Sequence, residues 1–102
     1  MMFAVVLCTV PQAEAETLAR TLVEEKIVAC VNAAPVRSFF FWEGALQEEG
    51  EMLLIMKTTA ANIPRTIARI REIHSYEVPE IIALPIIAGY EGYLDWVRET
   101  VR

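Results

Sequence analysis

The chain has few of the residues on which common catalytic and metal sites depend. Its 102 residues include one histidine, two cysteines and four glycines. It contains no GxSxG nucleophile elbow, no HExxH zinc motif and no glycine-rich phosphate loop. Cys8 and Cys30 lie too far apart for a CxxC redox or zinc motif, so we expect both thiols to be reduced. We therefore predict a protein that is not an enzyme.

Basic residues are also in the minority. Nine Lys and Arg residues stand against fourteen Asp and Glu, which gives a net charge of -5. Because phosphate backbones and anionic membranes both attract basic surfaces, we expect neither a nucleic acid nor a membrane as a partner. No apolar run approaches the roughly 20 residues of a transmembrane helix. The first residues lack the basic lead of a signal peptide, so we expect a cytoplasmic protein.

Hydrophobic periodicity predicts the secondary structure. Apolar residues at helical spacing indicate helices over 12–26, from Asn62 to near His74, and after Gly89. Strands are expected at 3–10, 27–31, 36–42, 52–57 and 80–87, with a turn at Glu43-Gly44. The order strand, helix, hairpin, helix, strand predicts a single α+β domain over residues 1–102. Its fold class would be a ferredoxin-like βαββαβ sandwich with a long hairpin and a short C-terminal helix.

The apolar content, 55% of the chain, exceeds what such a domain can bury alone. Two helices cover one face of a sheet, yet the strands at 3–10 and 52–57 are apolar on both faces. Phe39 and Phe41 cannot share a face with Phe40 and Trp42, so large rings would be exposed in a monomer. The last helix could cover part of this surface. A second subunit covers it more economically, and we predict an oligomer.

Five short motifs carry a family resemblance. They are Ala29-Cys30-Val31-Asn32, Trp42-Glu43-Gly44, Lys57-Thr58-Thr59, His74-Ser75-Tyr76-Glu77-Val78-Pro79-Glu80 and Tyr93-Leu94-Asp95-Trp96. In this order and spacing the chain resembles the CutA family of divalent-cation-tolerance proteins, from about Phe3 to Val101. The resemblance implies a cytoplasmic homotrimer and a role in tolerance to copper or another divalent cation. Trimeric PII-type signalling proteins share this architecture, which implies as an alternative a signalling or scaffold trimer with a ligand cleft and an unidentified partner.

The resemblance also implies metal ligands at Cys8 and His74. A second histidine that precedes the His74 position in some members is Ile73 here, so the ligand set is incomplete and a third ligand is missing. A tight site would have to borrow donors from another subunit or use methionine thioethers. The alternatives are a buried core cysteine at Cys8 and a His74 ring that bonds the last carbonyls of its helix. Cys30 is expected in the core.

A second implied site is a cleft between subunits, lined by Trp42, Lys57, Tyr76 and Glu80. It could hold a small anion or metabolite. The alternative is a buried Lys57–Glu80 ion pair that fixes the register of the trimer. The carboxylates of Glu48, Glu49 and Glu51 are interpreted as a solvated loop rather than a site for a hard cation.

Overall fold

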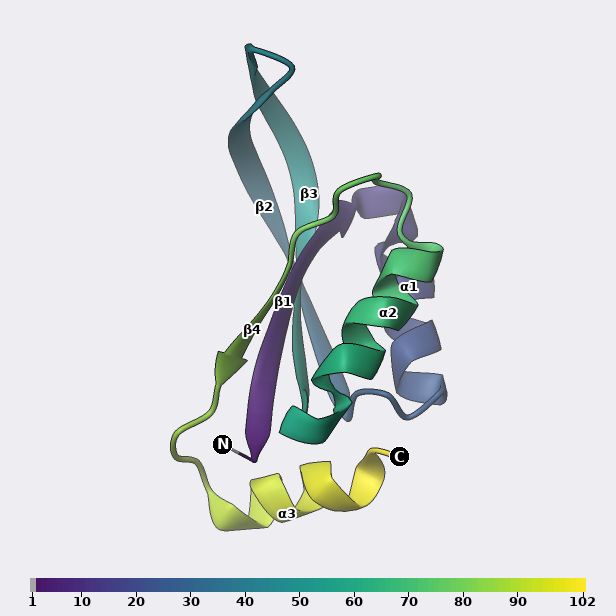
Figure 1. Cartoon of the computed structure of the whole chain (residues 1–102), viewed down its shortest axis with the longest axis vertical. Helices are drawn as coiled ribbons and strands as arrows, with labels where there is room; N and C mark the ends of the chain where they lie inside the picture. Colours follow the sequence, from purple (N-terminus) through teal and green to yellow (C-terminus); the bar gives the residue numbers. More distant parts are fainter. Residues whose placement is uncertain (1) are drawn as a thin grey trace.

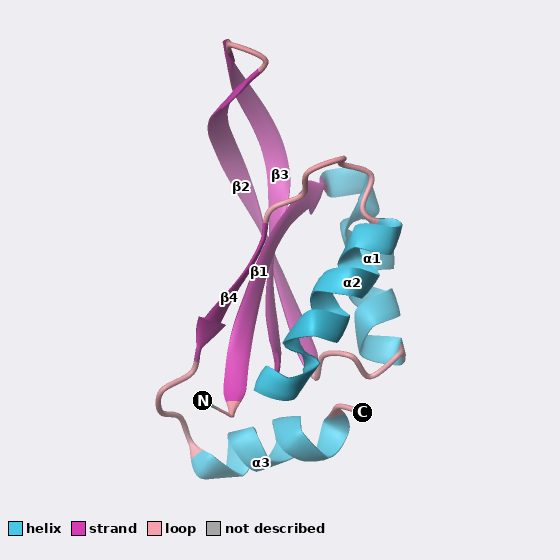
Figure 2. Ribbon diagram, viewed as in Figure 1, coloured by secondary structure: helices cyan, strands magenta, loops and turns pink. Residues whose placement is uncertain are grey.

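Four antiparallel strands form one sheet in the order β2-β3-β1-β4, and α1 and α2 pack on one of its faces (Figures 1 and 2). The computed structural model describes residues 2–102. Its elements are β1 (Phe3–Pro11), η1 (Gln12–Glu14), α1 (Ala15–Glu24), β2 (Cys30–Trp42), β3 (Ala45–Thr59), η2 (Ala60–Asn62), α2 (Ile63–Ile73), β4 (Ile81–Pro85) and α3 (Glu91–Thr100). The order of strands and helices agrees with the prediction. None of the helices within 2–102 is long and apolar enough to cross a membrane.

The core lies between the sheet and the two helices. Successive strand residues point to opposite faces, and the buried set on β1 is every second residue from Ala4 to Val10. Leu54 and Met56 of β3 lie on the same face, since Leu54 pairs with Cys8 and Met56 with Val6. Buried side chains from the helices complete the cluster: Ala15, Leu18, Leu22 and Ile70. Val23, although apolar and next to Leu22 on α1, is 38% exposed.

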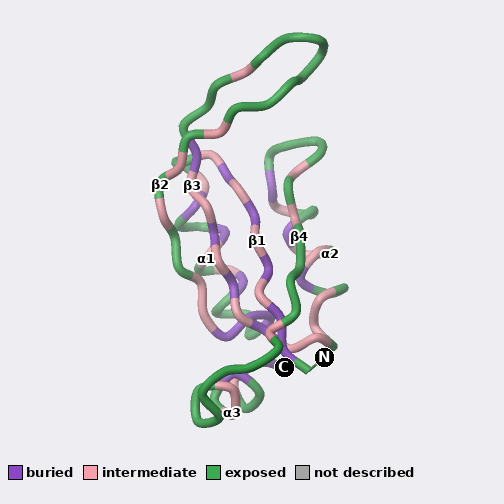
Figure 3. The backbone as a smooth tube through the Cα atoms, turned by 90° about the vertical axis from the view of Figure 1, so that its left-hand side faces the viewer, coloured by how far each residue is buried: buried purple, intermediate pink, exposed green. Residues whose placement is uncertain are grey.

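The opposite face of the sheet, which we call the open face, carries apolar side chains without a covering helix. It comprises Val5, Leu7, Leu53, Ile55, Ile82 and Leu84, by their alternation with the core residues. Ile82 and Leu84 on β4 are 48% and 47% exposed, and Figure 3 shows the whole of β4 as a largely exposed edge. Helix α3 lies at one end of the sheet, where Val97 and Val101 pack with Phe3 in a second small cluster (Figure 1).

Strand β2 begins later than predicted and joins the two strands expected at 27–31 and 36–42 into one. Residues 27–29, expected in a strand, are buried in an irregular turn that follows Lys26, whose φ of 59° ends the helical path. The strand continues through residues 32–35, which lie between the two predicted strands and include Pro35. Because β2 is an edge strand, Pro35 can lack an N–H without breaking a ladder between two neighbours.

Asn62 precedes the first residue of α2, but its side chain makes no capping hydrogen bond to that helix. Its Nδ2 donates instead to the carbonyl oxygens of Ile27, at 3.0 Å, and Arg102, at 3.2 Å. Because Thr58 Oγ1 also donates to Ile27 at 2.8 Å, the buried carbonyl of the irregular turn is satisfied from two directions. Asn62 therefore joins the start of α2 to distant segments rather than stabilising its own helix.

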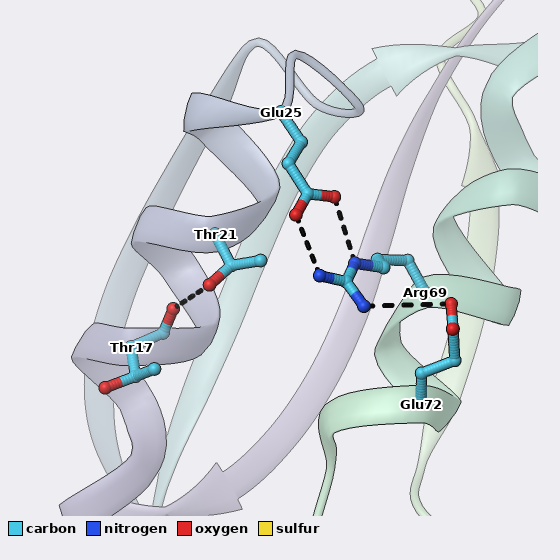
Figure 4. A network of polar contacts seen from close by, with 5 residues as sticks. All are labelled: Thr17, Thr21, Glu25, Arg69 and Glu72. Carbon is cyan, nitrogen blue, oxygen red and sulfur yellow. Dashed lines mark hydrogen bonds and ion pairs between the residues drawn. The ribbon is translucent and has the colours of Figure 1, made fainter.

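A paired arginine and glutamate join the two long helices (Figure 4). Arg69 on α2 donates from Nε to one oxygen of Glu25 at 2.9 Å and from Nη2 to the other at 2.8 Å. Glu72, one turn further on α2, lies 3.9 Å from the same guanidinium. The hydrogen bonds and positive charge of Arg69 lower the pKa of Glu25. This pair holds the C-terminal end of α1 against the middle of α2.

Candidate ligand cleft

A cleft of about 940 Å³ lies where the β2–β3 hairpin meets the rest of the molecule. The hairpin extends beyond the rest of the sheet, and the segment that joins α2 to β4 crosses the molecule near its base (Figure 1). Hairpin residues, the end of β1 and that connecting segment all contribute to the lining. The lining includes Thr9, Pro11, Phe40, Trp42, Glu49, Glu51, Tyr76, Glu77 and Glu80.

Four aromatic residues line the cleft. Phe40 and Trp42 are two residues apart on β2 and so lie on the same face of the hairpin, whereas Phe39 lies on the other. All three are exposed, as the sequence predicted for this aromatic run. Tyr76 contributes the fourth aromatic residue from the connecting segment. Large exposed rings in a concave surface are typical of a binding site for another molecule.

The charge of the cleft is negative. Glu49, Glu51, Glu77 and Glu80 line it, and among residues 2–102 no lysine or arginine does. Carboxylates without basic neighbours create a negative potential that attracts cations and repels anions. The cleft therefore favours a positively charged occupant.

Glu51 is unusual among these carboxylates because its side chain is buried. The residue is 5% exposed, and its Oε2 accepts a hydrogen bond of 2.8 Å from the Tyr76 hydroxyl. No ion pair within residues 2–102 includes Glu51. Burial, and then the hydrogen bond and charge of Glu51, raise the pKa of Tyr76 to about 12. The interpretation of Glu48, Glu49 and Glu51 as a solvated loop is wrong in two respects, because all three belong to β3 and Glu51 is buried, although Glu48 and Glu49 are exposed as expected.

His74 fixes the connecting segment beside the cleft. Its Nε2 lies 2.8 Å from the carbonyl oxygen of Thr9, and its Nδ1 accepts a hydrogen bond of 3.0 Å from the backbone N–H of Tyr76. These partners require the neutral ring with its proton on Nε2, as inferred from the hydrogen bonds. The alternative, that the ring bonds the last carbonyls of α2, is wrong. The ring bonds a carbonyl of β1 instead.

Cys8 lies on the core face of β1 and is fully buried. Burial, followed by the charges of Glu80 and Glu51, raises the pKa of its thiol to about 12. A metal would have to displace the proton of this buried thiol and one hydrogen bond of the His74 ring, because both ring nitrogens are occupied. Within residues 2–102 no three His, Cys, Asp or Glu side chains gather to hold a metal ion. Cys8 and His74, as they stand in one chain, do not fit a copper site.

A family model described as CutA1 divalent ion tolerance protein matches residues 4–100. The chain belongs to the CutA1 family. Among its relatives, a divalent-cation tolerance protein CutA from Thermus thermophilus is 50% identical over 97 residues, which cover 93% of this chain and 94% of that one. The chloroplastic protein CutA of Arabidopsis thaliana is 43% identical over 96% of this chain and 55% of its own length. A solved structure described as the periplasmic CutA of Archaeoglobus fulgidus matches with a TM-score of 0.96 and 39% identity, covering 99% of this chain and 100% of that chain.

The structure of this CutA1 family member brings three of the four predicted cleft residues together. Trp42, Tyr76 and Glu80 line one cleft, whereas Lys57 does not. Lys57 lies further along the open face, where its Nζ donates to the side chain of Asn32 and to the carbonyl of Ile55. Sequence reasoning did not predict that Glu51 lines the cleft. Its alternation with Leu53 and Ile55 could have placed it on the apolar face of a strand.

Proposed function

We propose that the protein supports divalent-cation tolerance by binding a divalent cation, copper among them, as a cytoplasmic homotrimer without catalysis. The negative cleft is the observation that carries this proposal, because four carboxylates and no basic side chain draw cations to it. The carboxylates of the cleft attract divalent cations in general rather than one particular metal, which agrees with tolerance to several divalent ions. Cys8 does not reach the cleft, because its side chain is buried on the core face of β1. His74 would join a site there only if one of its two ring hydrogen bonds opened.

The proposed trimer is supported by the open face. In one chain Ile82, Leu84 and the rings of the hairpin are exposed, and apolar surface of this kind is stable when another subunit covers it. The number three comes from the family resemblance. We also propose that the protomer is ferredoxin-like, which agrees with the sheet order β2-β3-β1-β4 and with both long helices on one face.

Titration of the reduced protein with Cu(I) and Cu(II) by isothermal calorimetry tests the metal function. We expect saturation at a defined stoichiometry. Loss of binding in Cys8→Ala or His74→Ala would assign the ion to those side chains, and loss in Glu51→Gln alone would assign it to the cleft. The Glu24→Gln variant is the control, because Glu24 lies on α1 away from the cleft. Absence of saturable binding in the unmodified protein would contradict the proposal.

A second candidate function is a signalling or scaffold trimer whose cleft binds a small molecule. It is favoured by the volume of the cleft, since about 940 Å³ lined by four aromatic residues far exceeds what a metal ion fills. A screen of metabolites by thermal shift tests it. The alternative is an ion pair between Lys57 and Glu80 of different subunits. In that case Lys57→Met would lower the stability of the trimer, and no metabolite would raise the stability of the unmodified protein.

A further inference from the structure

We propose that hydrogen peroxide joins the Cys30 sulfur to the Lys57 amine of the same chain in a sulfenamide bond, which makes this pair a redox modification site. The sequence predicts Cys30 in the core, but this prediction is wrong. The residue is half-buried at the start of β2, opposite Lys57 on the open face. The inference goes beyond the metal and ligand functions proposed above and depends on neither.

The pairing of β2 with β3 places the two side chains next to each other. Cys30 lies directly opposite Lys57, and opposite residues of antiparallel strands have Cβ atoms about 4.5–5.5 Å apart on one face of the sheet. Both polar ends also meet at one atom. The Cys30 Sγ lies 3.8 Å from Oδ1 of Asn32, and the Lys57 Nζ donates to the same oxygen. The thiol and the amine are therefore held close together.

Helix α3 of the same chain adds a third polar group to this pair (Figure 1). Tyr93 lies on α3, and burial, followed by the charge of Cys30 and a hydrogen bond with it, raises the pKa of Tyr93. The phenol hydroxyl thus faces the thiol. Since all three side chains belong to one chain, the pair is complete in each subunit. A second subunit over the open face would shield the pair without separating its members.

The chemistry takes two steps. The Cys30 thiolate first attacks an oxygen of hydrogen peroxide, so that an S–O bond forms and the O–O bond breaks. The sulfur is oxidised by two electrons to a sulfenic acid, and the peroxide is reduced to water. The unprotonated Lys57 amine then attacks the sulfur, so that an S–N bond forms, the S–O bond breaks and the hydroxyl leaves as water with one amine proton. Sulfenic acids condense with backbone nitrogen in the same way.

Cys8 provides a comparison within the chain. It is fully buried on the core face, and burial raises the pKa of its thiol to about 12, so it resists oxidation. Its neighbours across the sheet are Leu54 and Ile81, neither of which carries an amine. Because Cys8 and Cys30 lie on opposite faces of the sheet, their sulfurs cannot form a disulfide within one chain. The Lys57 amine is therefore the partner for an oxidised Cys30.

Mass spectrometry of the reduced, assembled protein after treatment with hydrogen peroxide at pH 9 tests the proposal. We expect each chain to lose about 2 Da, one hydrogen from the thiol and one from the amine, and tryptic peptides to be linked through Cys30 and Lys57. Dithiothreitol should restore the original mass, because its thiolate attacks the sulfur and releases the amine.

Two lysine variants separate the cross-link from simple oxidation. Lys57→Arg keeps the positive charge and removes the nucleophilic amine, so Cys30 should instead gain about 16 Da per added oxygen. Lys26→Arg replaces the other lysine of the chain, which lies beyond α1, and should cross-link like the wild-type protein. If Lys57→Arg does not fold, Cys30→Ser replaces it and should show no cross-link.

Three results would overturn the proposal. The first is a wild-type protein whose Cys30 gains oxygen without a link to Lys57. The second is a cross-linked mass that persists in Lys57→Arg or Cys30→Ser, or that disappears in Lys26→Arg. The third is an unchanged wild-type mass at a peroxide concentration that oxidises free glutathione.

Discussion

The single histidine of the chain acts as a clamp between two segments that are distant in the sequence. One ring nitrogen reaches the carbonyl of Thr9 on β1, and the other accepts from the N–H of Tyr76. Tyr76 in turn donates to Glu51 on β3. A chain of three hydrogen bonds therefore runs from β1 through the connecting segment to β3, and it determines the position of one aromatic wall of the cleft.

Variants of His74 should show how much each of its two hydrogen bonds contributes to the free energy of unfolding. His74→Ala leaves the Thr9 carbonyl and the Tyr76 N–H without partners, which we expect to lower the free energy of unfolding by about 2–4 kcal/mol. In His74→Asn the side-chain oxygen occupies the place of Nδ1, and in His74→Gln the side-chain nitrogen occupies the place of Nε2. Each should therefore lose about half as much stability. Urea unfolding of the three variants measures this, and equal losses in all three would contradict the clamp.

Sequence reasoning identified some residues of the cleft and failed on others for a physical reason. Trp42, Tyr76 and Glu80 come from short motifs that a family resemblance can mark. Glu51 belongs to an acidic run, and acidic runs are most often exposed to solvent. Its burial depends on the pairing of β3 with β1, where Glu51 lies opposite Pro11, and on the hydroxyl of Tyr76. Such contacts join distant parts of the chain, whereas the local alternation of Glu51 with Leu53 and Ile55 indicates only the face of the strand on which Glu51 lies.

At the scale of elements, the contact between α1 and α2 combines apolar packing with one charged pair. The fork of Arg69 holds both oxygens of Glu25 (Figure 4). Its geometry is specific because a guanidinium and a carboxylate match in two parallel hydrogen bonds. The pair joins the last residues of α1 to the middle of α2, and so fixes how far one helix extends along the other.

The Glu25–Arg69 pair should make stability depend on acid pH. The pKa of Glu25 is lowered in the folded protein from its usual value of 4.5, so its stabilisation is present above 4.5 and is lost as the pH falls through the folded pKa. We expect Glu25→Gln to lower Tm at pH 7 and to lower it by less at pH 3. Glu24→Gln, its neighbour on α1, is the matched control and should show no such convergence. A constant Tm difference in Glu25→Gln at both pH values would contradict the role of the pair.

The limits of the elements show what periodicity can and cannot determine. Periodicity predicted the helix at α1 correctly, because three of its apolar residues at helical spacing, Ala15, Leu18 and Leu22, are buried. Strand β2 was misplaced at its start because the turn at 27–29 is as apolar as a strand. Its continuity across Pro35 follows from its place at the sheet edge, which depends on the order of all four strands.

At the scale of the whole molecule, a single chain covers only one face of its sheet. The helices cover one face of the sheet, and β4 and the hairpin leave apolar side chains in contact with water on the other (Figure 3). The cleft lies beside this open face, since Thr9 and Glu51 alternate with core residues on β1 and β3. Assembly through the open face would therefore place the cleft at a boundary between subunits.

A charged residue on the open face should dissociate the proposed trimer. Leu84 is 47% exposed in one chain, and Leu84→Glu would place an unpaired carboxylate in an apolar interface, at a large desolvation cost. Light scattering should report three chains for the unmodified protein and a lower mass for Leu84→Glu. Val23→Glu is the matched control, because Val23 is 38% exposed on α1, away from the open face, and its variant should keep three chains. A single-chain mass for the unmodified protein, or an intact trimer in Leu84→Glu, would show that the open face is not the surface on which the subunits assemble.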